Sequence, residues 1–293
     1  MKLGATFPQT EIGPDPAAVK TYAQAVEAMG FDYLLAYDHV LGADVGARPD
    51  WRPLRGGPPA YTHLDQFHEP FVLFGYLAGV TERIGLATGV LVLGQRQTAL
   101  VAKQAAEVDV LTGGRLRLGI GIGWNDVEYE ALAMDFRNRG ARSEEQVELL
   151  RALWTRPVVD FDGRWHKVTA AGINPLPVQR PIPIWFGGRA DAVLDRIGRV
   201  GDGWFATADR EEVKAGMERV RESARRAGRD PEAIGVEVGV QLGSRTPEDG
   251  AHRAEEWRDA GVTHLTFNTM IAGLKGVDAH IDALSRFKAA FSR

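Results

Sequence analysis

An adjacent carboxylate and imidazole, Asp38 and His39, form the pair of side chains in this sequence best suited to proton transfer. Imidazole exchanges protons readily near neutral pH, and histidine is the commonest general acid or base in enzymes. The pair directly follows a short apolar stretch, Phe31 to Ala36, that is typical of a β-strand. A capping aspartate beside a packed histidine is the alternative interpretation.

A second candidate is the glycine-rich run from Gly119 to Gly123, which ends in Trp124 and Asn125. Glycines remove side chains, so that a flat ligand could lie against the backbone. A layer of small residues inside a barrel would give the same pattern. The large ring and the amide that follow the glycines favour a pocket wall.

A third candidate is Gly187-Gly188-Arg189, which stands before a helix that we expect from Ala190. Free backbone N–H groups and the positive end of a helix attract an anion, and glycine lets it approach closely. An arginine adds a charge-assisted hydrogen bond. The sequence therefore predicts a phosphate site here, with a tight turn and a solvated arginine as the alternative.

A loop from Gly42 to Phe67 follows the Asp38-His39 pair. Loops of this length in compact proteins are usually functional or disordered, and Trp51 and Tyr61 argue against disorder. We expect a lid over an apolar substrate, although an exposed aromatic patch for a protein partner would look the same. The nearby His63, His68 and Glu69 have poor spacing for one helix face, so we expect no metal site.

These residues must be positioned by strands and helices that alternate along the whole chain. Apolar strands are expected to begin near residues 2, 31, 84, 116, 182, 203, 234 and 262, each followed by a helix. Eight such units predict a closed (β/α)8 TIM barrel as a single domain over 1–293, with insertions after strands 2 and 4. The second insertion should contain a helix over 143–154 capped by Ser143, and a hairpin over 158–171. In such a barrel all three candidates lie at the carboxyl ends of strands, where active sites form.

Composition narrows the class of function. The 293 residues carry a formal net charge of -4 and no cysteine. This charge gives no general attraction to nucleic acid or to an anionic membrane, and the lack of cysteine excludes disulfides and thiolate chemistry. No secretion signal and no long apolar run is apparent, so we expect a cytoplasmic protein that acts on a small-molecule substrate.

Several segments together resemble the bacterial luciferase-like superfamily of flavin and deazaflavin oxidoreductases, and most of all its coenzyme F420-dependent branch. They are AYDH at 36–39, FHEP at 67–70, TERIGLATGVLVL at 81–93, AKQAAEVDVLTGGRLRLGIGIGWN at 102–125, PIPIWFGG at 181–188 and GDGW at 201–204. The resemblance implies a TIM barrel, commonly a homodimer, with the tricyclic ring of the cofactor in the barrel mouth.

The resemblance also implies roles for single residues. His39, with Asp38, would lie at the reactive face of the ring and exchange a proton while hydride moves. Gly89 and Val90 would form a bulge with a non-proline cis peptide behind the ring. The residues expected to contact the cofactor are Asp38, Gly89, Val90, Gly121, Gly123, Asn125, Gly187, Gly188 and Arg189.

One departure concerns the substrate. Some F420-dependent sugar-phosphate dehydrogenases of this fold place a catalytic glutamate where this chain has Trp124, and Asn125 cannot replace its acid function. We therefore expect a larger and mostly apolar substrate in a pocket of Trp51, Tyr61 and Trp124.

Two alternatives stay open. One is an FMN-dependent two-component monooxygenase that receives reduced flavin from a separate reductase. The other is a barrel that binds a cofactor without catalysis. The oligoglutamyl tail of F420 would prefer a basic exit path, for which the candidates are Arg96, Arg137, Arg139 and Arg180.

Overall fold

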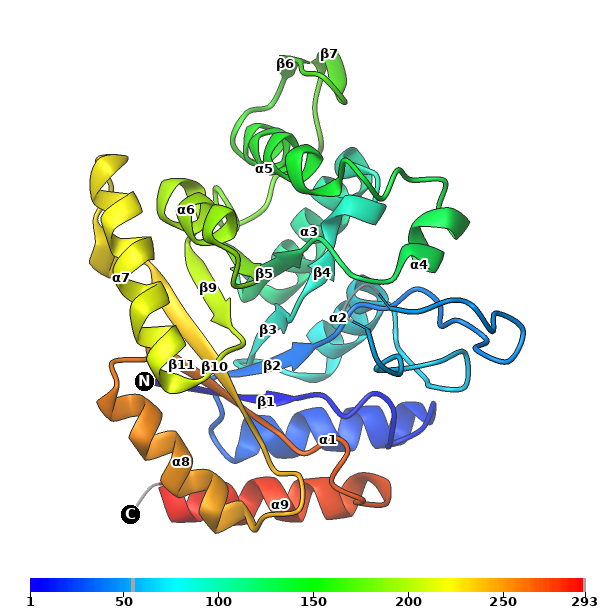
Figure 1. Cartoon of the computed structure of the whole chain (residues 1–293), viewed down its shortest axis with the longest axis vertical. Helices are drawn as coiled ribbons and strands as arrows, with labels where there is room; N and C mark the ends of the chain where they lie inside the picture. The colour runs from blue at the N-terminus through cyan, green and yellow to red at the C-terminus, as the bar shows by residue number, and fades with distance from the viewer. Residues whose placement is uncertain (54–55, 292–293) are drawn as a thin grey trace.

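A computed structural model describes residues 1–53 and 56–291, and it folds as a closed barrel of eight parallel strands (Figure 1). The strands follow one another around the barrel, and pairing of the third with the fourth closes it. They are β1 (Lys2–Thr6), β2 (Tyr33–Ala36), β3 (Gly85–Thr88), β5 (Leu116–Gly121), β8 (Ile184–Gly187), β9 (Gly203–Ala206), β10 (Gly235–Gln241) and β11 (His264–Asn268). The predicted barrel is confirmed, with every strand close to its expected place.

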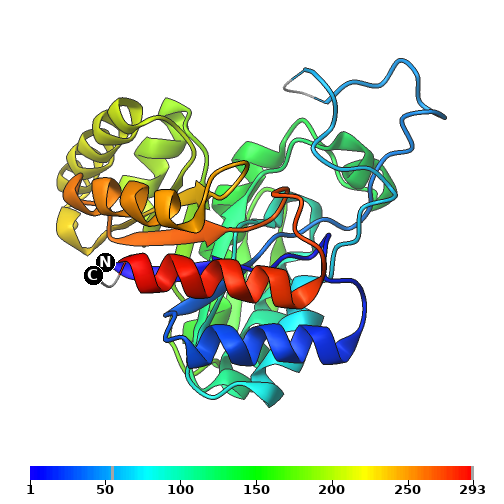
Figure 2. The same cartoon turned by 90° about the horizontal axis from the view of Figure 1, so that it is seen from below.

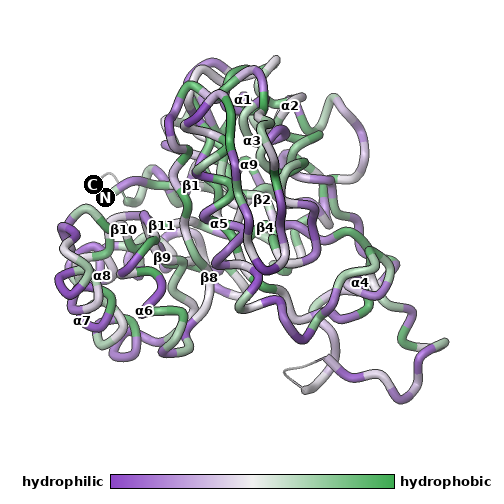
Figure 3. Tube along the Cα trace, turned by 90° about the horizontal axis from the view of Figure 1, so that it is seen from above, coloured by the Kyte–Doolittle hydropathy of each residue, from purple (hydrophilic) through white to green (hydrophobic). Residues whose placement is uncertain are grey.

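Helices surround the barrel and cover its outer face (Figures 1 and 2). Those that follow barrel strands are α1 (Pro16–Ala28), α2 (Pro70–Val80), α3 (Thr98–Thr112), α6 (Asp191–Val200), α7 (Arg210–Arg226), α8 (Pro247–Asp259) and α9 (Gly276–Phe291). Short 3-10 turns η1 (Leu93–Gln95) and η2 (Pro231–Ala233) complete the connections. In Figure 3 the helices α7 and α8 carry long hydrophilic stretches, consistent with an outer face in water. None of the helices within the described ranges is both long and apolar enough to cross a membrane.

Aromatic side chains packed against glycines fill the barrel interior. A Cβ atom at Gly203 or Gly235 would lie 2.2 Å or 2.4 Å from the ring of Trp185, and one at Gly4 would lie 2.2 Å from Tyr33. Glycine inside a strand is unfavourable unless another group must approach closely, as these rings do. The glycines of these strands therefore make space for core rings.

The lower end of the barrel, at the amino ends of the strands, contains a buried ion pair. The Nη2 atom of Arg117 lies 2.6 Å from the Oε2 atom of Glu237. The guanidinium also lies 4.3 Å from the ring centroids of Tyr33 and Trp185, within the range of cation–π contacts. Thr266 donates its hydroxyl to the other Glu237 oxygen, so both carboxylate oxygens have partners.

The two insertions occur where the sequence predicts them. Residues 37–69 follow β2, and residues 122–183 follow β5, the fourth barrel strand. The second insertion contains α4 (Asp126–Ala131), α5 (Arg139–Thr155) and a hairpin of β6 (Val159–Asp162) and β7 (Lys167–Ala171). The hairpin is held to the barrel through His166, whose ring nitrogens lie 2.8 Å from the Thr98 hydroxyl and 2.7 Å from a Glu145 oxygen.

Two local predictions in this insertion need correction. Helix α5 begins at Arg139 with Asn138 as its N-cap, four residues before the predicted start. Ser143 lies in its second turn and donates its hydroxyl to the Gly140 carbonyl, so the predicted cap is wrong. The sequence pattern of a capping box also occurs inside helices, where it has no capping role. The short helix α4 was not predicted.

Candidate active site

A small cavity of about 150 Å³ lies at the carboxyl ends of β2, β3 and β5, beside the two-residue strand β4 (Leu91–Val92). It brings together side chains and backbone from segments far apart in the sequence. Its lining consists of Tyr37, Asp38, His39, Gly89, Val90, Val92, Gly123, Trp124, Asn125 and Glu128. The structure thus places two of the three predicted motifs at one point, while Gly187, Gly188 and Arg189 are not part of the lining.

His39 is held between aromatic rings in this cavity. Its ring centroid lies 3.9 Å from that of Tyr61 and 4.8 Å from that of Phe67. The side chain keeps 19% of its surface exposed. Its Nδ1 atom is buried and has no hydrogen-bond partner among the described residues. The ring therefore has one shielded nitrogen, and Nε2 is its other site for proton exchange.

Glu128, on α4, lies beside that shielded nitrogen. Its side chain is 1% exposed, and its Oε1 atom is 3.7 Å from Nδ1 of His39. The same oxygen accepts the backbone N–H of Val40 at 2.7 Å and that of Leu41 at 3.4 Å. The sequence pattern does not predict this residue, because α4 spans only six residues. The available signal is an acidic residue in the first turn of the segment that follows the glycine-rich strand end.

Asp38 is fully engaged by protein groups. Its Oδ2 atom accepts the N–H of Val92 at 2.9 Å, and both oxygens accept from Arg96, at 3.1 Å and 2.6 Å. Arg96 also pairs with Glu69 at 3.0 Å. Burial alone would lower the pKa of Arg96, but the two carboxylates raise it above the usual value. Asp38 is thus a fixed carboxylate that ties the end of β2 to β4.

Tyr61, Trp124 and Asn125 form one wall of the cavity. The Tyr61 hydroxyl accepts a hydrogen bond from Nδ2 of Asn125 at 2.8 Å. The ring centroid of Tyr61 lies 5.3 Å from that of Trp124. Asn125 also caps α4, since its Oδ1 atom accepts the N–H of Val127 at 3.1 Å. Burial and the Glu128 carboxylate raise the pKa of Tyr61, so this phenol stays protonated. The amide of Asn125 is 2% exposed and is occupied by these structural contacts.

Trp51 joins the loop after β2 to α4. Its Nε1 atom donates to Asp126 at 2.8 Å, and its ring lies 6.5 Å from that of Trp124. A second contact in the same loop is the pair of Arg48 with Glu130, with nitrogen–oxygen distances of 3.2 Å and 3.3 Å. The three residues predicted for the substrate pocket, Trp51, Tyr61 and Trp124, are therefore neighbours.

The floor of the cavity is Val90. The peptide bond between Gly89 and Val90 is cis, as the resemblance implied. A Cβ atom at Gly121 would lie 2.5 Å from a Val90 methyl group, and one at Gly187 would lie 3.1 Å from the other. These two glycines allow Val90 to sit between the ends of β5 and β8.

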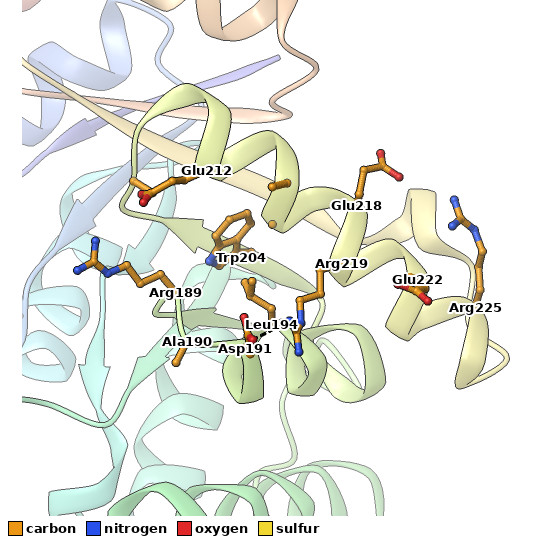
Figure 4. Close-up of a pocket in the computed structure, with 13 residues that line it drawn as sticks. Arg189, Ala190, Asp191, Leu194, Trp204, Glu212, Glu218, Arg219, Glu222 and Arg225 are labelled. Carbon is orange, nitrogen blue, oxygen red and sulfur yellow. Dashed lines mark ion pairs between the residues drawn. The ribbon is translucent and has the colours of Figure 1, made fainter.

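The predicted phosphate loop borders a different hollow, a groove of about 990 Å³ between α6 and α7 (Figure 4). Gly188 has a φ of 132°, which favours glycine, and its carbonyl accepts Nε1 of Trp204 at 2.7 Å. Arg189 is exposed at the groove edge, and its guanidinium makes no hydrogen bond or ion pair with the residues that the structure describes. Further along, Arg219 is paired with Asp191 at 2.8 Å. The charged residues of the lining are Arg189, Arg219, Arg225, Asp191, Glu212, Glu218 and Glu222.

The residues considered for a metal do not gather in this way. Within residues 1–53 and 56–291, no three His, Asp or Glu side chains are close enough to hold a metal ion. His68 contacts Gln66 at 3.2 Å, and burial lowers its pKa. Glu69 caps α2 by accepting the N–H of Val72 at 2.8 Å.

The closed barrel, with a cavity at the carboxyl ends of its strands, is consistent with the family that the sequence matches. The model of the family described as luciferase-like monooxygenase matches residues 2–288. The chain belongs to this family. The expected superfamily is thereby confirmed.

Luciferase-like relatives with both kinds of cofactor match this chain. A Mycobacterium tuberculosis protein of uncharacterized activity is 34% identical over 264 residues, 87% of this chain and 86% of that protein. The F420-dependent glucose-6-phosphate dehydrogenase of Nocardia farcinica is 34% identical over 213 residues, 67% of this chain and 61% of that enzyme. The FMNH(2)-dependent dimethylsulfone monooxygenase of Pseudomonas putida is 30% identical over 234 residues, 78% of this chain and 58% of that enzyme.

A solved structure shows the same luciferase-like fold. The monooxygenase RslO1 from Streptomyces bottropensis matches with a TM-score of 0.80 and 17% identity, over 100% of this chain and 99% of that one. At this sequence identity the match shows a shared fold and nothing more.

Proposed function

We propose that the protein is an F420-dependent oxidoreductase in which His39 exchanges a proton with a mostly apolar organic substrate. The observation that carries this proposal is the state of the ionisable groups in the cavity. Asp38 accepts hydrogen bonds from Arg96 and from the backbone of Val92. Burial raises the pKa of Tyr37, and the hydroxyl of Tyr37 accepts a hydrogen bond from Nδ2 of Asn268 at 2.8 Å. His39 is the histidine of the cavity lining, and histidine is the side chain that most often serves as a general acid or base.

The shape of the barrel mouth is compatible with a flat ring. Val90 offers an apolar floor, and the rings of Tyr61 and Trp124 form a wall that would exclude water. The volume of about 150 Å³ is below the roughly 300–1,000 Å³ of most ligand pockets. We therefore propose that the loop after β2 moves outward when the cofactor enters, and that the contact of Trp51 with Asp126 breaks.

The phosphate of the cofactor would lie at Gly187 to Arg189. Helix α6 begins there at Asp191, and backbone N–H groups at a helix start bind anions. Arg189 is exposed and has no ion-pair partner among the described residues, so it could add a charge-assisted bond. Beyond Arg189 the groove lining has four carboxylates and two arginines, so an oligoglutamyl tail would not follow it. Of the arginines considered for the tail, Arg96 is already paired with Asp38 and Glu69.

When bound, the deazaflavin would supply the hydride acceptor or donor, and the protein residues would handle protons and position. Asp38 would act by position, because it fixes Val92 and Arg96 at the cavity edge. His39 would hold or release the proton at Nε2, the nitrogen that is not shielded by Glu128. Such proton transfer typically contributes about 10²–10⁴-fold to a rate.

An FMN-dependent monooxygenase is the second candidate. The relative that uses FMNH(2) matches a larger share of this chain, 78%, than the F420-dependent relative does, 67%. Such an enzyme would need a flavin reductase as a partner. The same wall and floor would serve either ring, since both cofactors are tricyclic and phosphorylated.

Parallel fluorescence titrations of the purified protein with oxidised F420 and with FMN test the choice. We expect submicromolar binding of F420 and much weaker binding of FMN. The reverse preference would make the protein a flavin-dependent monooxygenase, and binding of neither would contradict both proposals.

We also propose a homodimer that uses α2 and α3. Val72 and Tyr76 on α2, and Leu100 and Leu111 on α3, expose 73%, 40%, 52% and 56% of their surfaces. Large exposed apolar patches mark interaction sites. Light scattering should give twice the chain mass, and Val72→Glu should yield monomers. A monomeric wild-type protein would contradict this proposal.

A further inference from the structure

We infer that Glu128 is a positioning residue for His39, which holds the imidazole proton on Nδ1 and directs Nε2 toward the reacting centre. This inference rests on the proposed role of His39. It concerns an interaction within the protein, so it can be tested without any cofactor.

The Glu128 carboxylate is buried inside the protein. With 1% exposure it has almost no contact with water, and a buried charge is costly unless it is hydrogen-bonded or paired. Its Oε1 atom has two backbone donors, Val40 and Leu41. Among the described residues, His39 is the only basic side chain within 4.0 Å. The imidazole is therefore the side chain that can give this carboxylate a positive charge, while the neutral Tyr61 hydroxyl also lies beside it.

His39 has one ring nitrogen beside this carboxylate. Its Nδ1 atom is buried, has no hydrogen-bond partner within residues 1–53 and 56–291, and lies 3.7 Å from the carboxylate. Buried polar atoms are normally hydrogen-bonded. A small rotation of the ring would bring an N–H on Nδ1 into hydrogen-bond range of Oε1, whereas a lone pair on Nδ1 would face a negative charge. The carboxylate thus favours the tautomer with the proton on Nδ1.

Neighbouring groups limit how far the imidazole ring of His39 can turn. Tyr61 stacks on it with an interplanar angle of 35°, and Phe67 meets it at 80°. Glu128 also holds the backbone that follows His39, through Val40 and Leu41. One carboxylate therefore fixes the chain and the imidazole together, which is how an orienting acid supports a catalytic histidine.

The consequence concerns the direction of proton transfer. With the proton on Nδ1, the Nε2 lone pair can accept a proton from a substrate. When both nitrogens are protonated, the imidazolium is stabilised by Glu128 and can donate from Nε2. Replacing the carboxylate by an amide would keep the contacts to Val40 and Leu41 but remove the negative charge, so that the ring could adopt the other tautomer, in which Nε2 cannot accept.

The test is ¹⁵N NMR of the ligand-free protein labelled at histidine, with His39 assigned by its absence in His39→Gln. In the wild type we expect the neutral ring to be protonated on Nδ1. In Glu128→Gln the amide can still accept the two backbone N–H groups, and we expect the Nε2-protonated tautomer to predominate. Glu128→Asp keeps the charge and should restore part of the Nδ1-protonated form. The control is Glu148→Gln, on an exposed position of α5, which should match the wild type.

A second readout separates positioning from general damage. With a substrate that the wild type turns over, Glu128→Gln should lower kcat by about 10–100-fold and leave KM within about threefold, in the manner of supporting residues behind catalytic groups. A wild-type His39 protonated on Nε2, or an unchanged tautomer and kcat in Glu128→Gln, would overturn the inference. The wild-type spectrum decides the point even if Glu128→Gln does not fold. Failure of the cofactor proposal would appear instead in the titrations.

Discussion

The two ends of the barrel both bury a carboxylate beside a basic side chain, but they complete the pair differently. At the lower end, Arg117 contacts Glu237 at 2.6 Å and is covered by aromatic rings. At the upper end, His39 lies 3.7 Å from Glu128 beside a cavity, and its Nδ1 atom has no hydrogen-bond partner in the part of the chain that the structure describes. A pair with its contacts filled serves stability, whereas a pair with a free proton site can serve chemistry. This division agrees with the general separation of stability and activity in TIM barrels.

The largest effect on stability is expected from breaking the lower pair. Arg117→Met leaves the Glu237 carboxylate buried without its cation, and such a change typically costs about 3–5 kcal/mol of unfolding free energy. Urea unfolding followed by circular dichroism measures this loss. The double variant Arg117→Met/Glu237→Gln, which removes both charges, should recover part of it. If the single variant lost less than about 1 kcal/mol, the lower pair would not be a stability element.

A smaller effect is expected from the floor of the upper end. The added methyl group of Gly121→Ala would lie 2.5 Å from a Val90 methyl, and overpacking of this kind typically costs about 1–3 kcal/mol. Cofactor binding should weaken with it, because the floor must move. Gly121→Ala/Val90→Ala should restore stability if the contact is the cause. A double variant no more stable than the single one would assign the glycine another role.

Acid should lower the free energy of unfolding through His264, which lies at the lower end of the barrel. Burial, and secondarily the charge of Arg117, lowers the pKa of His264 from 6.5 to about 3. Between these values the unfolded chain binds a proton that the folded chain excludes, so stability present above pH 6.5 is lost as the pH falls toward 3. Thermal unfolding from pH 7 to pH 4 should show a smaller loss for His264→Gln than for the wild type. Equal losses would exclude a contribution of this residue.

The smallest effect is expected at the loop contact of the upper end. Trp51→Phe removes the donor to Asp126, and one hydrogen bond of this type contributes about 0.5–1.5 kcal/mol. In the proposed opening of the loop this contact breaks, so its loss should speed association of the proposed cofactor without changing the site itself. Stopped-flow fluorescence compares the rates. A slower association in the variant would show that the contact assists entry.

Much of the upper end could be predicted from sequence because strand ends converge in a barrel. Once eight strands were recognised, Asp38 and His39 had to lie near Gly123 and Trp124, and the structure places all four around one cavity. The same reasoning put Gly187 to Arg189 on this rim. The assigned roles in cofactor binding remain predictions.

The partners of these residues could not be predicted in the same way. Asp38 is bound by Arg96, which is 58 positions away, and no sequence pattern links the two. Glu128 lies on a helix of six residues, too short to show a hydrophobic period. The glycine run predicts either space for a ligand or a layer of small residues, and the structure has Thr88, Phe205 and Val90 in the space beside Gly119 and Gly121. What occupies the space above a glycine depends on tertiary packing.

The most direct test of the difference between the two ends is the variant His39→Ala, with binding and turnover measured on the same preparation. We predict a thermal stability close to that of the wild type, cofactor affinity within a few fold, and a kcat reduced by about a hundredfold or more. That result would place proton transfer at the upper end. Unchanged turnover in a folded, cofactor-binding variant would contradict the central claim that His39 is the proton-exchanging group.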